Sequence, residues 1–364
     1  MSHEQLLEQV NHVEQKDKVA RYTELVAAWV KAADTAALRA FVTHIIALGE
    51  RGAVVVSRPA IRDFVAAIEA LSNADAETVG RFALDALRPR AVYYGDEIVP
   101  LARLLSEVFQ ANDRFLEAAK VLAQVDLSQA RNVTSAFKAE WFISTSEMFN
   151  AAGDTVSASS CISLAHREMA DVQDPIVIIR FKTLHALLCD AERKFLEACS
   201  KYIELSQMVA SGLINEESIL KSLENAVTCA ILAKAGPSRS RLFATLFRDE
   251  RSARLPNYRI LEKMFKERIL RASEVAKFEE TLQPHQRATL AGGVTVLKAA
   301  VNEHNSTWDA FENKLSWACQ PFCDFCFLLT SHPLQILALS ETQCWPLPRY
   351  IATSNSTSLV CCWI

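Results

Sequence analysis

The sequence predicts an all-α protein, a right-handed superhelix of antiparallel helix pairs. Two nearly identical phrases, RFLEAAKVLAQVDL (Arg114–Leu127) and KFLEACSKYIELSQ (Lys194–Gln207), lie eighty residues apart. A third phrase with the same rhythm of small and large residues, DTVSASSCISLAHREM, begins about midway at Asp154. A period of about 34–47 residues is typical of stacked helix pairs. Nine Gly and eleven Pro are few for 364 residues, whereas an all-β fold would need more turn residues.

Apolar residues at helical spacing mark the first helices of the chain. They recur every three or four residues, which places them on one face of a helix. Ser57 is expected to cap the third of these helices, with Pro59 in the first turn, where its missing N–H does no harm. The four predicted buried stripes are Val19, Tyr22, Val26 and Trp29; Leu38, Phe41, Val42 and Ile45; Ile61, Phe64, Val65 and Ile68; and Leu101, Leu104, Leu105 and Val108.

Small residues within the three repeated phrases indicate where neighbouring helices meet. The pairs Ala118–Ala119, Ala158–Ser159 and Ala198–Cys199 occupy matching places and let a second helix approach closely. Because one helix pair cannot bury its apolar face alone, such units are expected to stack. The order is interrupted at Ser206–Ser218, which contains Gly212 and is predicted to form a loop or short hairpin before a helix resumes at about Ile219.

Composition argues against several classes of protein. A formal net charge of −4 and a pI near 6.1 do not fit a general nucleic-acid binder. The basic run Ser238–Arg259 also contains acidic residues, so we expect a solvated helix face there. The N-terminus is too polar for a signal peptide, and no stretch before the C-terminal tail reaches about 18 uncharged apolar residues. The sequence predicts a protein of the nucleus and cytoplasm that binds neither nucleic acid nor membrane.

Two later segments resemble a known family. AGPSRSRLFATLFRDERSARLPNYRILEKMFKERIL (Ala235–Leu270) and FEETLQPHQRATLAGGVTVLKAAVNEHN (Phe278–Asn305) are similar to the fourth subunits of the COP9 signalosome, a family of PCI-domain proteins. The resemblance covers about residues 1–305. It implies a helical-repeat arm over residues 1–193 that leads into the helical part of a PCI domain over residues 194–305. In that family a small winged helix follows.

Residues 306–364 depart from the family. After Lys314 this tail has only three charged residues, and it holds four of the six tryptophans and six of the ten cysteines. We expect the winged-helix half to be missing and the tail to be poorly ordered, as the product of an alternative exon, a retained intron or a frameshift.

The resemblance implies a non-catalytic scaffold subunit of the complex that removes Nedd8 from cullins of cullin-RING ubiquitin ligases. Its partners would be the other signalosome subunits, including the isopeptidase pair, and the cullin-RING ligase through the complex. A short insertion of that family takes part in sensing the ligase, and Ser206–Ser218 is where it would fall. The partner-binding candidates are therefore Met208, Leu213, Ile214, Asn215 and Glu216.

Sequence motifs that would indicate catalysis are either absent or lack the fold that they require. Cys319, Cys323 and Cys326 have the spacing by which radical S-adenosylmethionine enzymes hold an iron–sulfur cluster. Those enzymes place the cluster in a parallel β/α barrel. Only 38 residues follow Cys326, and the preceding chain is predicted to be helical, so the sequence does not provide such a barrel. The sequence has no His-Glu-x-x-His, no His-x-His and no phosphate-binding Gly-x4-Gly-Lys motif. The charged cluster Arg248–Arg254 is interpreted as a solvated face. We predict no catalytic residue, cofactor or metal.

Two classes of function remain open at this point. The first is the scaffold subunit. The second is an assembly-defective or dominant-negative isoform, or a stand-alone helical-repeat adaptor for protein–protein interaction. The missing winged helix distinguishes these two classes of function, because assembly with neighbouring subunits by β-augmentation would use the edge of its sheet.

Overall fold

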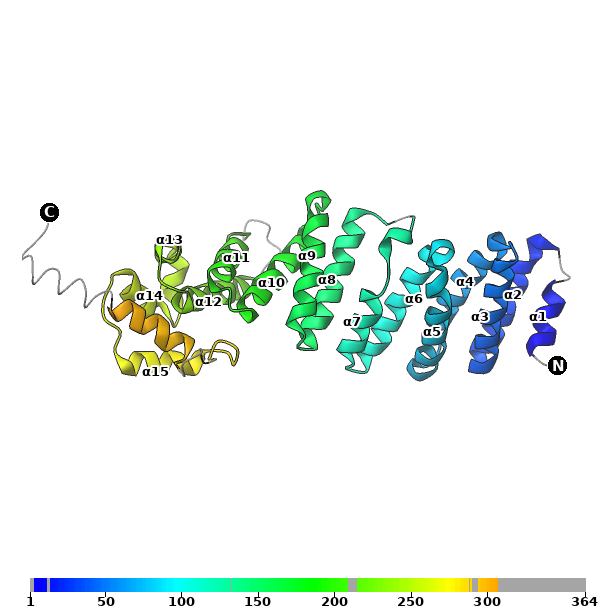
Figure 1. The fold of residues 1–364 in the computed structure, drawn as a ribbon, viewed down its shortest axis with the longest axis horizontal. Coiled ribbons are helices and arrows are strands. Elements are labelled where there is room, and N and C mark those ends of the chain that lie inside the picture. Colours follow the sequence, from blue (N-terminus) through cyan, green and yellow to red (C-terminus); the bar gives the residue numbers. More distant parts are fainter. Residues whose placement is uncertain are drawn as a thin grey trace, which may run out of the picture. The chain divides into compact units, whose positions relative to one another are not determined.

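The computed structural model describes residues 3–11, 14–131, 133–208, 215–287, 289 and 294–306, which belong to one compact unit, Met1–Ser306. Helices dominate this part of the chain (Figure 1). Its only β-type pairing is an isolated antiparallel bridge between Thr289 and Thr295. The predicted all-α fold is confirmed. The expectations for the tail, with its missing winged helix and its Cys319, Cys323 and Cys326, lie outside the described residues.

The helices follow one another with short connections. The first eight are α1 (His3–Asn11), α2 (Gln15–Lys31), α3 (Thr35–Glu50), α4 (Val54–Ile68), α5 (Asn73–Leu87), α6 (Ala91–Ala111), α7 (Phe115–Ala123) and α8 (Ser135–Ala151). The next are α9 (Thr155–Glu168), α10 (Pro175–Ala191), α11 (Phe195–Gln207), α12 (Glu216–Leu232), α13 (Pro237–Arg248), α14 (Tyr258–Phe265) and α15 (Ala272–Thr281). A short 3-10 helix, η5 (Glu250–Arg254), links α13 to α14, and residues 296–306 are again helical.

Each helix packs on its neighbours in the chain. The main contacts join consecutive helices, such as α8 with α9 and α11 with α12, or helices one step further apart, such as α2 with α4 and α3 with α5 (Figure 1). This pattern of near-neighbour contacts defines a helical repeat. The buried apolar residues form three clusters along the stack, covering Leu7–Trp141, Ala119–Leu188 and Ala186–Val301. The predicted boundary between residues 193 and 194 stays a prediction.

A recurrent turn explains the forty-residue repeat. Ala33, Asp113, Gly153 and Arg193 all have positive φ, and the last three are forty residues apart. After α6 the N–H of Asp113 donates to the Gln110 carbonyl and that of Arg114 to the Phe109 carbonyl, which is a Schellman ending. The same two bonds close α2, α8 and α10. Because the next helix begins directly after this turn, the two helices must fold back on each other.

The predicted buried stripes are confirmed. Within α3, Leu38, Phe41 and Ile45 are fully buried, and the other stripes have the same character, with Val19 and Val108 only partly buried. The small residues of the repeats also lie in helix contacts: Ala118, Ala158 and Ala198 are fully buried. Such positions admit no larger side chain without moving a neighbouring helix.

Ser57 does not cap a helix, contrary to expectation. Helix α4 begins at Val54, so Pro59 lies inside it. The Ser57 hydroxyl is buried and forms a hydrogen bond of 2.9 Å with the hydroxyl of Tyr94. A tertiary contact with the kinked start of α6 has replaced the local capping role.

The predicted loop Ser206–Ser218 is shorter than expected. Helix α11 extends to Gln207, and α12 begins at Glu216 rather than near Ile219. Glu216 and Glu217 occupy the first turn of α12, where negative charge is favourable near the positive end of the helix dipole.

Candidate functional site

The predicted partner-binding segment lies at the junction of α11 and α12. Met208 is the C-cap residue directly after α11, and Asn215 is the residue before α12, without a capping hydrogen bond from its side chain. Glu216 forms an exposed ion pair of 3.5 Å with Arg254. Leu213 and Ile214 lie outside the described residues. The structure therefore brings the flanks of the segment close to η5, and the segment's role stays a prediction.

The Arg248–Arg254 cluster is only in part the predicted solvated face: Arg248, Glu250 and Arg254 are exposed, whereas Asp249 and Arg251 are half-buried. Arg251 donates through Nη1 to the Ser206 carbonyl at 2.9 Å and through Nη2 to Asp249 at 2.7 Å. This pair is partly buried, and the hydrogen bond from Arg251 holds the pKa of Asp249 below its usual value. Arg251 links η5 to the end of α11, because its guanidinium donates to a carbonyl that the helix end leaves without a partner.

Arg239 is a second exception to the predicted solvated face. Its side chain is buried, donates to the Ala233 carbonyl at 2.8 Å and lies over the Phe243 ring. Burial lowers the pKa of this guanidinium, and the charge of Glu303 partly opposes that effect. Arg239 therefore holds the end of α12 against the start of α13.

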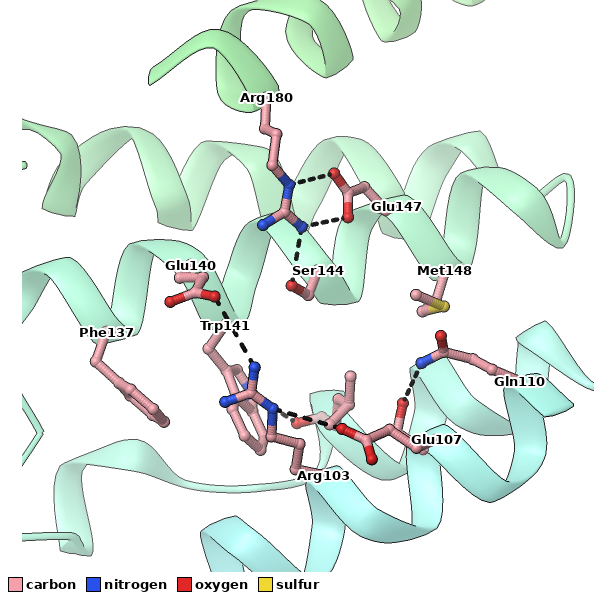
Figure 2. Close-up of a pocket in the computed structure, with 12 residues that line it drawn as sticks. Arg103, Glu107, Gln110, Phe137, Glu140, Trp141, Ser144, Glu147, Met148 and Arg180 are labelled. Atoms are coloured by element: carbon pink, nitrogen blue, oxygen red, sulfur yellow. Dashed lines mark hydrogen bonds and ion pairs between the residues drawn. The ribbon is translucent and has the colours of Figure 1, made fainter. Parts of the chain in front are cut away.

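A charged groove lies between α6 and α8 (Figure 2). We call it the α6–α8 groove; its volume is about 340 Å³. Helix α6 supplies one wall, α8 the other, and α7 and α10 contribute one side chain each. Its lining residues are Arg103, Ser106, Glu107, Gln110, Leu122, Phe137, Glu140, Trp141, Ser144, Glu147, Met148 and Arg180.

The two arginines of this groove differ in how firmly they are held. Arg180 donates to both carboxylate oxygens of Glu147, at 3.0 and 2.6 Å, and these bonds raise its pKa. Arg103 points between Glu107 and Glu140 at 3.8 and 3.9 Å, beyond hydrogen-bond distance (Figure 2). Because its side chain is 56% exposed, the donors of Arg103 remain accessible to a bound molecule.

The floor of the α6–α8 groove is apolar. Trp141 is buried, and its indole N–H donates to the Leu122 carbonyl at 3.3 Å, which fixes the ring. The Phe137 ring lies 6.0 Å from it, measured between centroids. Three glutamates and two arginines line the groove, so the accessible guanidinium above an aromatic floor fits a polypeptide segment that offers it a neutral hydrogen-bond acceptor. None of the lining side chains is His, Cys or Lys, so the groove offers no activated nucleophile.

Sequence reasoning missed the α6–α8 groove. Its signal was weak, since Arg103 and Glu140 look like ordinary exposed residues on two separate helices. Their pairing depends on how α6 and α8 are placed side by side, and no pattern within one helix reports that.

The described cysteines are chemically inert. Cys161, Cys189, Cys199 and Cys229 are free thiols, and all four are buried. Burial raises the pKa of each, that of Cys199 to about 12. A thiolate is the reactive form, so these side chains act as small apolar packing residues.

Metal-ligand clusters and membrane-spanning helices are both absent from the part of the chain that the structure describes. No group of three or more His, Cys, Asp or Glu side chains there is arranged to hold a metal ion. Nor is any helix of that part long and apolar enough to cross a membrane.

Stacked helix pairs that present grooves, with buried inert thiols, define a helical-repeat protein of the protein-interaction class. The model of the family described as "PSMD12/CSN4, N-terminal" matches residues 2–211, and the chain belongs to this family. The COP9 signalosome complex subunit 4 of Arabidopsis thaliana is 33% identical over 297 residues, or 80% of this chain and 74% of the relative. The COP9 signalosome complex subunit 4 of Dictyostelium discoideum is 34% identical over 303 residues, or 83% of this chain and 76% of the relative. The resemblance seen in the sequence is confirmed.

Proposed function

We propose that this chain is a non-catalytic scaffold subunit of the COP9 signalosome. The observation that carries the proposal is its identity of 31–34% with four proteins named COP9 signalosome complex subunit 4. In each case the match covers 74% or more of this chain. Similarity over that length extends through the arm and the following helices rather than a single motif.

The fold is suited to such a role. A stack of helix pairs offers long continuous surfaces, and each exposed groove can hold a segment of another subunit. In this proposal the partners are the other signalosome subunits, including the isopeptidase pair, and cullin-RING ligases through the complex. The location would be the nucleus and cytoplasm. Nedd8 removal from cullins would be carried out by another subunit.

The α6–α8 groove is the surface that we propose as one of the subunit contacts. Arg103 supplies a guanidinium whose nearest carboxylates stand 3.8 and 3.9 Å away, and the aromatic floor beneath it is rigid. A backbone carbonyl of a neighbouring subunit, which adds no charge beside the glutamates of the groove, would accept from Arg103 and replace these weak pairs at little cost, because exposed ion pairs contribute only about 0–1 kcal/mol.

Co-purification tests the proposal. The tagged chain is expressed with the remaining signalosome subunits and separated by size, beside the Dictyostelium relative as a positive control. We expect the chain to elute at the size of the full complex. Elution of the chain alone, while the relative is incorporated, would contradict the proposal and favour the assembly-defective isoform or the stand-alone adaptor.

A pair of matched variants tests the groove within the same experiment. Arg103→Glu places a third carboxylate beside Glu107 and Glu140 and should lower incorporation at equal folded content. Arg167→Glu makes the same change at an exposed position of α9 outside the groove and should have no effect. Equal incorporation of the two variants would remove the α6–α8 groove from the proposal.

A further inference from the structure

We propose that a second groove, formed by α11, α12 and the helical segment 296–306, binds an amphipathic helix of a partner protein that has acidic residues along its flank. We call it the α11–α12 groove. Its volume is about 550 Å³, within the range of ligand-binding clefts. It is lined by Arg193, Lys194, Phe195, Leu196, Glu197, Leu232, Ala233, Lys234, Val296, Ala299, Ala300 and Glu303. This inference goes beyond the proposed function and does not depend on it.

The walls of the groove are held firmly. The Schellman turn before α11 is closed by the Lys194 N–H, which donates to the Cys189 carbonyl at 2.8 Å. At the other wall, Arg239 holds the Ala233 carbonyl, and Glu303 accepts from the Ala235 N–H at 3.2 Å. The groove therefore exists before any partner arrives, and binding would not require the ordering of these walls.

The floor of the groove is apolar and has room for large side chains. Phe195, Leu232 and Val296 form its buried apolar surface. Ala299 and Ala300 face the same space from segment 296–306, and their small side chains leave it open. Because all walls are helices, the complementary shape is another helix that places its large residues between theirs.

The charge around the groove favours a partner helix with an acidic flank. Among the residues that the structure describes, neither Arg193 nor Lys234 has an ion-pair partner, and both side chains are exposed. The other lysine of the rim, Lys194, is paired with Glu192 at 2.9 Å, and its pKa is raised by that hydrogen bond and then by the charges of Glu192 and Glu197.

The two glutamates of the rim balance part of this positive charge. Glu303 accepts a backbone N–H and lies near the buried Arg239, and Glu197 acts on Lys194. Arg193, Lys194, Lys234 and the neighbouring Arg239 carry four positive charges against three negative ones on Glu192, Glu197 and Glu303, so positive charge is in excess. Among the described residues, the exposed cations of the rim without an ion-pair partner are Arg193 and Lys234, beside the apolar floor. Acidic residues on a partner helix would neutralise them, whereas basic residues would be repelled.

The test uses the purified full chain and two synthetic peptides of about 16 residues, a length at which a designed sequence can be helical. Both carry leucines at positions i, i+3, i+4 and i+7; one has glutamates along the flank and the other has lysines. Fluorescence anisotropy measures binding of each labelled peptide. We expect the glutamate peptide to bind at least about tenfold more tightly than the lysine peptide.

Three variants separate the groove from its surroundings. Arg193→Glu with Lys234→Glu should reverse the preference, so that the lysine peptide now binds more tightly. That gain of binding also shows that the variant is folded. Ala299→Trp fills the groove and should abolish binding of both peptides, while Lys298→Glu, on the same helix but outside the lining, should leave the preference unchanged.

Several results would overturn the inference. These are the absence of binding by the glutamate peptide, equal binding of both peptides, or binding that survives Ala299→Trp. A photo-crosslinker at Ala299 that reacts with residues 307–364 of the same chain, or with a second copy of the chain, would assign the groove to that occupant instead. Because no signalosome subunit is present, these results are independent of the co-purification experiment.

Discussion

The replacement Arg58→Ala should destabilise the N-terminal part of the stack strongly. Arg58 on α4 donates through Nε to Glu97 on α6 at 3.2 Å and through Nη2 to Asp96 at 2.6 Å. The Glu97 side chain is only 1% exposed. Without Arg58 the nearest remaining cation is Arg62, whose Nη2 lies 3.7 Å from Glu97 and whose side chain is mostly exposed.

The size of the effect follows from burial. Removing one partner of a buried ion pair costs about 3–5 kcal/mol, because an uncompensated charge is left behind. Arg58 is 24% exposed and Arg62 remains near, so water and the second guanidinium reduce the loss to about 2–3 kcal/mol. The pKa of Arg58 is raised: burial opposes its charge, but the hydrogen bond to Asp96 and the charge of Glu97 outweigh burial.

Urea unfolding followed by circular dichroism measures the loss, and hydrogen exchange locates it. In a helical repeat each unit contacts mainly its neighbours, so exchange should accelerate in α4 and α6 and remain unchanged in α12. Arg21→Ala is the control, since its pair with Glu24 is exposed on both sides and should contribute at most about 1 kcal/mol. Arg58→Met combined with Glu97→Gln should recover part of the loss. Equal stability of Arg58→Ala and Arg21→Ala would refute the argument.

Close packing and titrating groups make three other positions sensitive to substitution, pH or alkylation. Gly95→Ala should lower the free energy of unfolding by about 1–3 kcal/mol, because the added Cβ would lie 2.6 Å from a backbone carbonyl oxygen. Gly80→Ala should lower it less, since its Cβ would meet only the movable side chain of Leu105. Urea unfolding that ranks the two variants in the reverse order would contradict this reasoning. The pKa of Asp249 is depressed by the hydrogen bond from Arg251, so its contribution to stability is present above the unfolded pKa and is lost as the pH falls through the folded one. Asp249→Asn should therefore flatten the acid side of the stability profile, and an unchanged profile would speak against the pair. Cys199 should resist iodoacetamide in the native protein and react in urea, as mass spectrometry would show; native labelling would contradict its burial.

The sequence by itself determined the helices and the faces that they bury. Phe41 and Ile45 are fully buried as their spacing predicted, because 3.6 residues per turn is a local property of the backbone. The repeated phrases likewise predicted the helix pairs, since the polar turns before them hold the positive-φ residues Asp113, Gly153 and Arg193. The family resemblance was readable for the same reason, as it rests on the order of residues along the chain.

Only the tertiary structure decided which polar side chains meet. No pattern in the sequence indicates that Arg239 is buried, or that the Gln286 amide donates to the buried Asp190 carboxylate at 2.9 Å across 96 residues of chain. It also could not place Arg103 beside Glu140, or Arg193 and Lys234 beside one apolar floor. The physical reason is that such meetings depend on the rotation and offset of one helix against another. Those are set by the packing of the whole core, whereas a periodic pattern reports only one helix at a time.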